Sequence, residues 1–165
     1  MEFNVGAAVV HWTYGLGKIV AVEERALAGQ KTLYYVVQIN DLTVWVPVDE
    51  KAKMRLRPPT SQNAFKKLFK ILSEPGKSLS EDRHERKVDL HQKLQDGNVE
   101  SLCTVIRDLS SYQHKKALND DDKVILRRAS TSLLGEWGYS FSVSVAQAEQ
   151  ELRGLLRPPP EGSRG

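Results

Sequence analysis

Residues 33–48 read Leu33-Tyr34-Tyr35-Val36-Val37-Gln38-Ile39-Asn40-Asp41-Leu42-Thr43-Val44-Trp45-Val46-Pro47-Val48, and this stretch decides the fold of the first third of the chain. β-Branched and aromatic residues fill both of its halves, which predicts two strands. Asn40-Asp41 between them is typical of a tight turn, because both side chains tolerate the left-handed backbone. Pro47 has no N–H to donate to a ladder, so the second strand should end there or lie at a sheet edge.

The same strand pattern extends back towards the N-terminus. Residues 5–12 lead through the glycines of residues 14–17 into a further apolar run, and residues 28–31 turn the chain again. Glycine readily adopts the positive φ angles that tight reversals need. Short strands at this spacing, with no helical segment between them, predict a small antiparallel barrel over residues 1–57. We expect at least two of four aromatic residues to be buried, namely Trp12, Tyr34, Tyr35 and Trp45. Tyr34 and Tyr35 should point to opposite faces.

After Pro58-Pro59 the apolar residues recur three and four apart, which is the helical period. Each apolar stripe is narrow and needs a partner, so residues 58–156 are predicted to form a small all-α bundle. The tail, residues 157–165, has little to bury and is predicted to be disordered. The predicted fold class is therefore α+β, with a small β-barrel followed by a helical domain.

Residue types that accept N-terminal backbone N–H groups mark the predicted helix starts. Gly97 is a suitable residue to follow a helix C-terminus. The acidic run Asp120-Asp121-Asp122 suits the positive end of a helix. The predicted N-terminal caps are Thr60 or Ser61, Ser80, the segment beginning at Asn119, and Ser144.

The composition narrows the class of protein. The chain has 165 residues, with 24 lysines and arginines against 21 acidic residues, so its net charge of +3 is mild. Nucleic-acid affinity would therefore need a local basic patch. A single cysteine, Cys103, fits a reducing compartment. We find neither a signal-peptide pattern nor a membrane-spanning apolar run, and we expect a cytoplasmic protein with no membrane partner.

The motifs that usually carry catalysis or bind cofactors are incomplete. His84 and His91 lack the further ligands of a metal site, and Gly15-Leu16-Gly17-Lys18 lacks the length and hydroxyl of a phosphate loop. Residues 120–122 lack the spacing of a calcium loop, and Cys103 lies on an apolar stripe typical of a buried residue. We therefore expect a non-enzymatic protein without a cofactor, a metal or a small-molecule substrate.

Two sets of residues, one in each predicted module, follow one another along the chain in a recognisable order. The N-terminal set is residues 3–6, 9–10, 14–17, 23–25, 29, 34–35 and 41–48, and the C-terminal set is residues 86–87, 94, 96–98, 105–109, 126 and 129. Through these residues the chain resembles the CarD/CdnL family of bacterial transcription regulators, and the resemblance spans both modules, from Met1 to about Leu156.

The resemblance implies that the barrel is a Tudor-like domain that docks on the β subunit of RNA polymerase through a sheet edge. Arg25 matches a family position implicated in this contact. Trp45, beside Val44, falls on another, where some members carry arginine. An exposed edge strand with aromatic anchors would suit such docking. The polymerase-binding residues expected from the resemblance are Arg25, Val44 and Trp45.

The resemblance also implies that the helical domain contacts promoter DNA near the upstream edge of the transcription bubble and stabilises the open complex. Characteristic family members carry a tryptophan wedge at the start of the second helix, where this chain has Arg83. The expected DNA-binding residues are the basic residues Arg83, Arg86, Lys87, Lys123, Arg127 and Arg128. Arg83 in place of tryptophan keeps open an alternative function, a polymerase-binding or other protein-interaction adaptor that does not wedge into DNA.

Overall fold

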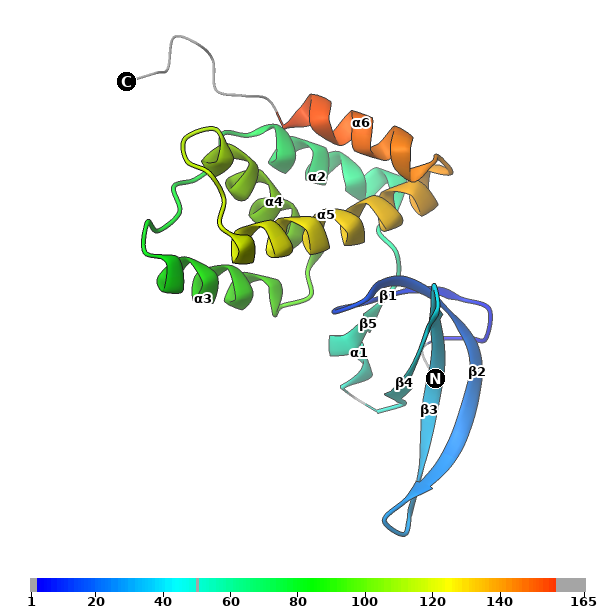
Figure 1. The fold of residues 1–165 in the computed structure, drawn as a ribbon. Helices are drawn as coiled ribbons and strands as arrows, with labels where there is room; N and C mark the ends of the chain where they lie inside the picture. The colour runs from blue at the N-terminus through cyan, green and yellow to red at the C-terminus, as the bar shows by residue number, and fades with distance from the viewer. Residues whose placement is uncertain (1–2, 50, 157–165) are drawn as a thin grey trace. The chain divides into compact units, whose positions relative to one another are not determined.

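The computed structural model describes residues 3–49 and 51–156, and the predicted disordered tail lies outside these residues. The chain divides into two compact units, residues 1–59 and residues 60–165 (Figure 1). The first is a β-sheet unit and the second is a helical unit, which confirms the predicted α+β class. The units separate after Pro59, two residues beyond the expected boundary.

In the described part of the β-sheet unit, residues 3–49 and 51–59, five antiparallel strands lie in the order β4-β3-β2-β1-β5. Strands β2 and β3 extend beyond the others as a two-stranded ribbon (Figure 1). A single helical turn, α1, connects β4 to β5 and was not predicted. The strands are β1 (Ala8–His11), β2 (Gly15–Leu27), β3 (Gln30–Ile39), β4 (Leu42–Pro47) and β5 (Leu56–Arg57), and α1 spans Ala52–Arg55.

The predicted turn at Asn40-Asp41 is confirmed, since Ile39 pairs with Leu42 and Asn40 adopts a φ of 53°. The glycines of residues 14–17 differ in role. Gly15 takes the positive φ of the first turn, at 89°. Gly17 instead lies inside β2, where an added Cβ would stand 2.5 Å from Ile39 Cγ1. This position needs glycine because β3 packs closely against it.

Alternate side chains of the strands form the core of the β-sheet unit, as the period of two requires. Tyr35 is buried and Tyr34 is only half-buried, so their predicted opposite orientation is confirmed. The expectation that at least two of the four aromatic residues are buried was wrong, because Trp12 and Trp45 are exposed and Tyr34 is half-buried, which leaves Tyr35 alone of the four in the core. The buried core consists of Val9, Ile19, Tyr35, Val37, Ile39, Val46, Ala52 and Leu56.

Within its described residues, 60–156, the helical unit contains five helices. Its main core surrounds the indole of Trp137, which packs against Phe65 and Phe69. A second cluster around Leu90 and Leu109 joins α3, α4 and α5. The helices are α2 (Gln62–Ser73), α3 (Arg83–Leu94), α4 (Val99–Gln113), α5 (Asp120–Phe141) and α6 (Val145–Leu155).

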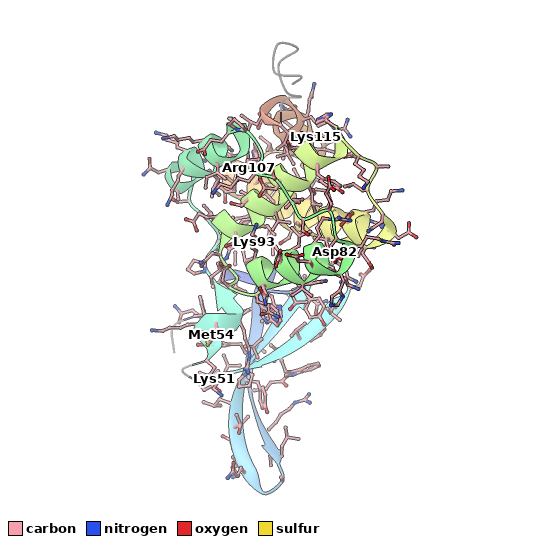
Figure 2. All side chains as sticks on the ribbon, turned by 90° about the vertical axis from the view of Figure 1, so that its left-hand side faces the viewer. Lys51, Met54, Asp82, Lys93, Arg107 and Lys115 are labelled. Carbon is pink, nitrogen blue, oxygen red and sulfur yellow. The ribbon has the colours of Figure 1, made fainter. Side chains whose placement is uncertain are left out.

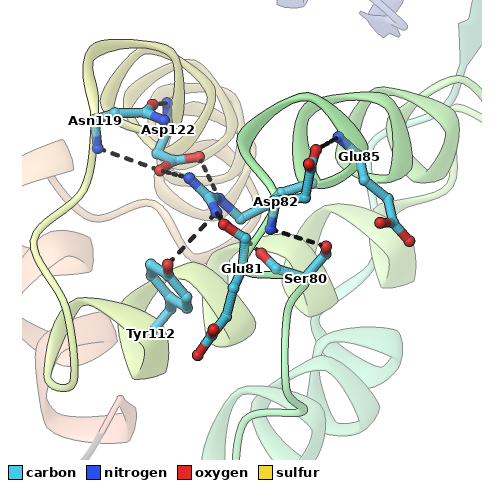
Figure 3. Close-up of polar contacts among 8 residues, drawn as sticks. Ser80, Glu81, Asp82, Glu85, Tyr112, Asn119 and Asp122 are labelled. Carbon is cyan, nitrogen blue, oxygen red and sulfur yellow. Dashed lines mark hydrogen bonds and ion pairs between the residues drawn. The ribbon is translucent and has the colours of Figure 1, made fainter.

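Most predicted helix starts are confirmed. Ser61 caps α2, Ser144 caps α6, and Asn119 forms a reciprocal capping box with Asp122 at the start of α5. The predicted cap at Ser80 was wrong. Asp82 caps α3 by accepting the Glu85 N–H at 2.8 Å (Figure 3), because a carboxylate also favours the positive end of a helix.

Candidate protein- and nucleic-acid-binding surfaces

A polar and aromatic cluster lies on the face of the sheet opposite its core. The Arg25 guanidinium lies 4.5 Å from the ring centroid of Trp45, within cation–π range. Trp45 Nε1 donates to Glu23 Oε2 at 3.2 Å, and Arg25 Nε lies 3.6 Å from the same oxygen. Two of the residues expected to bind polymerase thus lie side by side, on β2 and β4. We call Glu23, Arg25 and Trp45 the Arg25–Trp45 cluster.

Glu23 was not among the predicted residues. A sequence signal for it existed, because it precedes Arg25 by two residues and so shares its face of the strand. Val44, which was predicted, lies half-buried against the sheet core instead. Its side chain therefore does not join the cluster. Trp45 remains 39% exposed, which leaves much of its ring available to a partner.

The cluster adjoins a sheet edge that no other described strand pairs with, because β4 is the last strand in the sheet order. Val48 donates its N–H to the carbonyl of Leu33 at 2.9 Å, at the end of the β3–β4 ladder. Hydrogen-bonded pairs alternate along an antiparallel ladder, so Thr43 and Trp45 direct their backbone N–H and C=O groups away from β3. A partner strand could add to this edge beside the exposed indole.

Arg86 is buried rather than exposed, in a polar network whose other members Ser80, Tyr112 and Asp122 are labelled in Figure 3. Its Nε and Nη2 donate to the two carboxylate oxygens of Asp122 at 3.0 and 2.9 Å. Nη1 donates to the Ser80 carbonyl at 2.9 Å, and the guanidinium lies 5.0 Å from the centroid of the Tyr112 ring. The hydrogen bond to Asp122 raises the pKa of Arg86 above its ordinary value.

Arg86 is only 3% exposed and Asp122 only 1% exposed. The guanidinium therefore holds α3 against α5, and a phosphate could reach it only if this pair opened. We therefore expect Arg86 to stabilise the helical unit and not to contact DNA. The sequence contained a signal for its burial, since Arg86, Leu90 and Leu94 are spaced by four and share one helix face.

The other five predicted DNA-binding residues are exposed. Lys87 is 46% exposed and lies 3.6 Å from Asp121 Oδ1, so it joins α3 to α5 at the surface. Arg83 is the first residue of α3, and Lys123 and Arg127 lie one turn apart on α5. The Arg86–Asp122 pair therefore brings the basic starts of α3 and α5 together. We call Arg83, Lys123, Arg127 and Arg128 the basic surface.

The described residues were also searched for metal-binding groups, a reactive cysteine and membrane-spanning helices. Within residues 3–49 and 51–156, no group of three or more histidine, cysteine or acidic side chains is placed to hold a metal ion. Cys103 is buried, as its apolar stripe predicted. None of the described helices is long and apolar enough to cross a membrane.

Two family models match the chain in the order of its two units. The CarD-like/TRCF RID domain matches residues 3–58, and the C-terminal domain of CarD matches residues 67–153. A curated protein of Bacillus subtilis (strain 168), "Putative transcription factor YdeB", is 30% identical over 139 residues, which cover 81% of this chain and 89% of that protein. The fold and both models define a two-domain protein, an RID-type sheet followed by a CarD-type helical domain. The chain belongs to the CarD/CdnL family of bacterial transcription regulators.

Proposed function

We propose that this protein regulates transcription initiation without catalysing a reaction, in the bacterial cytoplasm and on the nucleoid. The β-sheet unit binds the β subunit of RNA polymerase, and the helical unit contacts promoter DNA near the upstream edge of the bubble and stabilises the open complex. The observation that carries the proposal is the half-exposed Arg25–Trp45 cluster beside the unpaired β4 edge. This edge supplies backbone hydrogen bonds, and the cluster supplies an aromatic anchor and a charge.

The polymerase contact is tested with the full chain and purified cognate polymerase. Trp45→Ala should weaken binding about fivefold or more, because a partly desolvated tryptophan is a typical interface anchor. Arg25→Glu should weaken it by reversing a charge at the rim, mainly through the association rate. Biolayer interferometry measures both constants.

Trp12→Ala is the matched control. Trp12 is also an exposed tryptophan, but it lies in the turn between β1 and β2 and not on β4. Circular dichroism checks that each variant keeps its fold. Equal binding by wild type and Trp45→Ala would remove the Arg25–Trp45 cluster from the interface and overturn this part of the proposal.

The DNA contact is tested through its salt dependence. Replacing the basic surface (Arg83, Lys123, Arg127 and Arg128) with alanine should lower the slope of log affinity against log salt by about 0.9 per lost phosphate contact. The control removes four exposed charges elsewhere in the helical unit, Lys66, Lys67, Lys70 and Lys77. A slope that changes only in the control would place the DNA surface on α2 and the segment that follows it.

The alternative function is that of a polymerase-binding adaptor that does not act on the transcription bubble. It is favoured by the acidic side chains among the basic ones, since Asp121 neutralises Lys87 and Asp120 and Glu85 lie exposed nearby. Absence of salt-dependent promoter binding, with polymerase binding intact, would support the adaptor over the DNA-contacting regulator.

A further inference from the structure

Three aromatic rings gather at the turn between β1 and β2. The rings of Trp12 and Tyr14 lie nearly parallel to the imidazole of His11, at 27° and 28°, with centroids 6.2 and 5.1 Å away. Trp12 and Tyr14 are 51% and 52% exposed, whereas His11 is buried. Two large aromatic side chains are thus exposed to solvent while they pack against a buried imidazole. We call Trp12 and Tyr14 the aromatic turn.

Hydrogen bonds fix this turn. His11 Nδ1 accepts the backbone N–H groups of Thr13 at 3.1 Å and Tyr14 at 3.3 Å. Trp12 donates its own N–H to the carbonyl of Arg55 at 2.9 Å, which ties the turn to α1 and β5. Burial, with a smaller contribution from the Arg55 charge, lowers the pKa of His11 below its ordinary value. A neutral imidazole suits the role of Nδ1 as an acceptor, and these hydrogen bonds hold the backbone of the turn in place before anything binds.

The chain segments around the aromatic turn are basic. Residues 3–22 and 51–57 carry five lysines and arginines and no acidic residue. Strand pairing brings these segments together, with His11 opposite Leu56 and Ala8 opposite Lys18. Lys51, the N-cap residue of α1, and Met54 within α1 are exposed (Figure 2). Acidic residues border both segments: Glu23 directly follows residue 22, and Asp49 accepts the Lys51 N–H at 2.8 Å. The five basic residues are Lys18, Lys51, Lys53, Arg55 and Arg57.

We propose that the aromatic turn and its basic surroundings bind single-stranded DNA, with unpaired bases stacked on Trp12 and Tyr14 and phosphates facing the basic side chains. Single strands are bound by this combination of exposed aromatic rings and positive charge, because an unpaired base offers its face to a ring. A paired base keeps its face inside the duplex. The choice of DNA over RNA rests on the proposed function, which brings the protein beside melted promoter DNA.

This site differs from the proposed polymerase surface. The sheet order places β1 and β5 at the edge opposite β4, so the aromatic turn and the unpaired β4 edge belong to opposite ends of the sheet. The residues of either surface can therefore be substituted without changing residues of the other. One protein could hold polymerase by β4 while β1 and α1 contact an exposed strand.

The test is fluorescence anisotropy with a labelled oligothymidine of about 12 nucleotides, within the site sizes that such surfaces cover. The full chain is used, in a background that already lacks the basic surface of the helical unit. Trp12→Ala with Tyr14→Ala should weaken binding about tenfold or more, since both stacking rings are lost. Trp12→Phe with Tyr14→Phe should restore most of the affinity. Arg55→Ala should lower the salt slope by about 0.7 if it contacts one phosphate.

Trp45→Ala is the matched control and should leave oligothymidine binding unchanged. Equal affinity in the wild type and the double alanine variant, or no binding at all, would overturn the proposal whatever the outcome of the polymerase experiment. Tighter binding of oligouridine than of oligothymidine would assign the site to RNA and overturn the DNA assignment. Weaker polymerase binding in the double alanine variant, with oligothymidine binding absent, would show a protein interface instead.

Discussion

Arg86→Ala is expected to lower the free energy of unfolding of the helical unit by about 3–5 kcal/mol, because it leaves the buried carboxylate of Asp122 without its partner. Both oxygens of Asp122 accept from the guanidinium at 2.9–3.0 Å. The same carboxylate accepts the Asn119 N–H at 3.2 Å and so belongs to the cap of α5. Loss of Arg86 would therefore loosen both the α3–α5 contact and the start of α5.

Urea unfolding followed by circular dichroism at 222 nm measures this loss, since the helices lie in the helical unit except for the single turn of α1. Lys87→Ala is the matched control, because its ion pair with Asp121 is solvent-exposed and should contribute about 0–1 kcal/mol. Arg86→Lys should fall between the two, as lysine keeps the charge but not the bidentate geometry. A loss below about 1 kcal/mol for Arg86→Ala would contradict the buried role and return Arg86 to the DNA surface.

Elements with strong local signals were predictable from the sequence. Asn40-Asp41 fixes a two-residue hairpin by its backbone preference, and Asn119 with Asp122 fixes the start of α5 by reciprocal hydrogen bonds. Helix α1 was missed because four residues are too few for a helical period to emerge. Ser80 and Asp82 are both suitable caps by type, and tertiary packing decided between them, since the Ser80 carbonyl accepts from Arg86.

The candidate sites were predictable to different extents. Placing Arg25 beside Trp45 required the strand register, in which β3 lies between β2 and β4, and the family resemblance supplied both residues without that geometry. The helical spacing of Arg86 with Leu90 and Leu94 indicated that Arg86 faces inward, but its partner Asp122 lies 36 residues away, and no local pattern predicts that pairing. The aromatic turn was not predicted as a binding surface, because aromatic residues in a small barrel are ordinarily assigned to its core.

The departure from the family at the start of α3 leads to the last prediction. Arg83 is exposed at the first position of α3, directly after its Asp82 cap. A guanidinium pairs well with phosphates and enters narrow minor grooves, but it gains little by filling an unstacked base step. We therefore expect wild-type protein to prolong the lifetime of open promoter complexes only weakly. Arg83→Trp should lengthen that lifetime about tenfold, because a planar apolar ring offsets part of the cost of unstacking.

The lifetime is measured as the decay of heparin-resistant complexes formed by cognate polymerase on one promoter, with wild type, Arg83→Trp and Arg83→Ala. The alanine variant separates the loss of arginine from the gain of tryptophan. Lys87→Trp places the same ring one turn further along α3, at a position that is also exposed, and should give no gain if the wedge depends on the helix start. A wild type that already prolongs the lifetime strongly, with no gain from Arg83→Trp, would show that this protein stabilises the bubble without a wedge. The basic surface and the aromatic turn would then be left as the structural means of holding melted DNA.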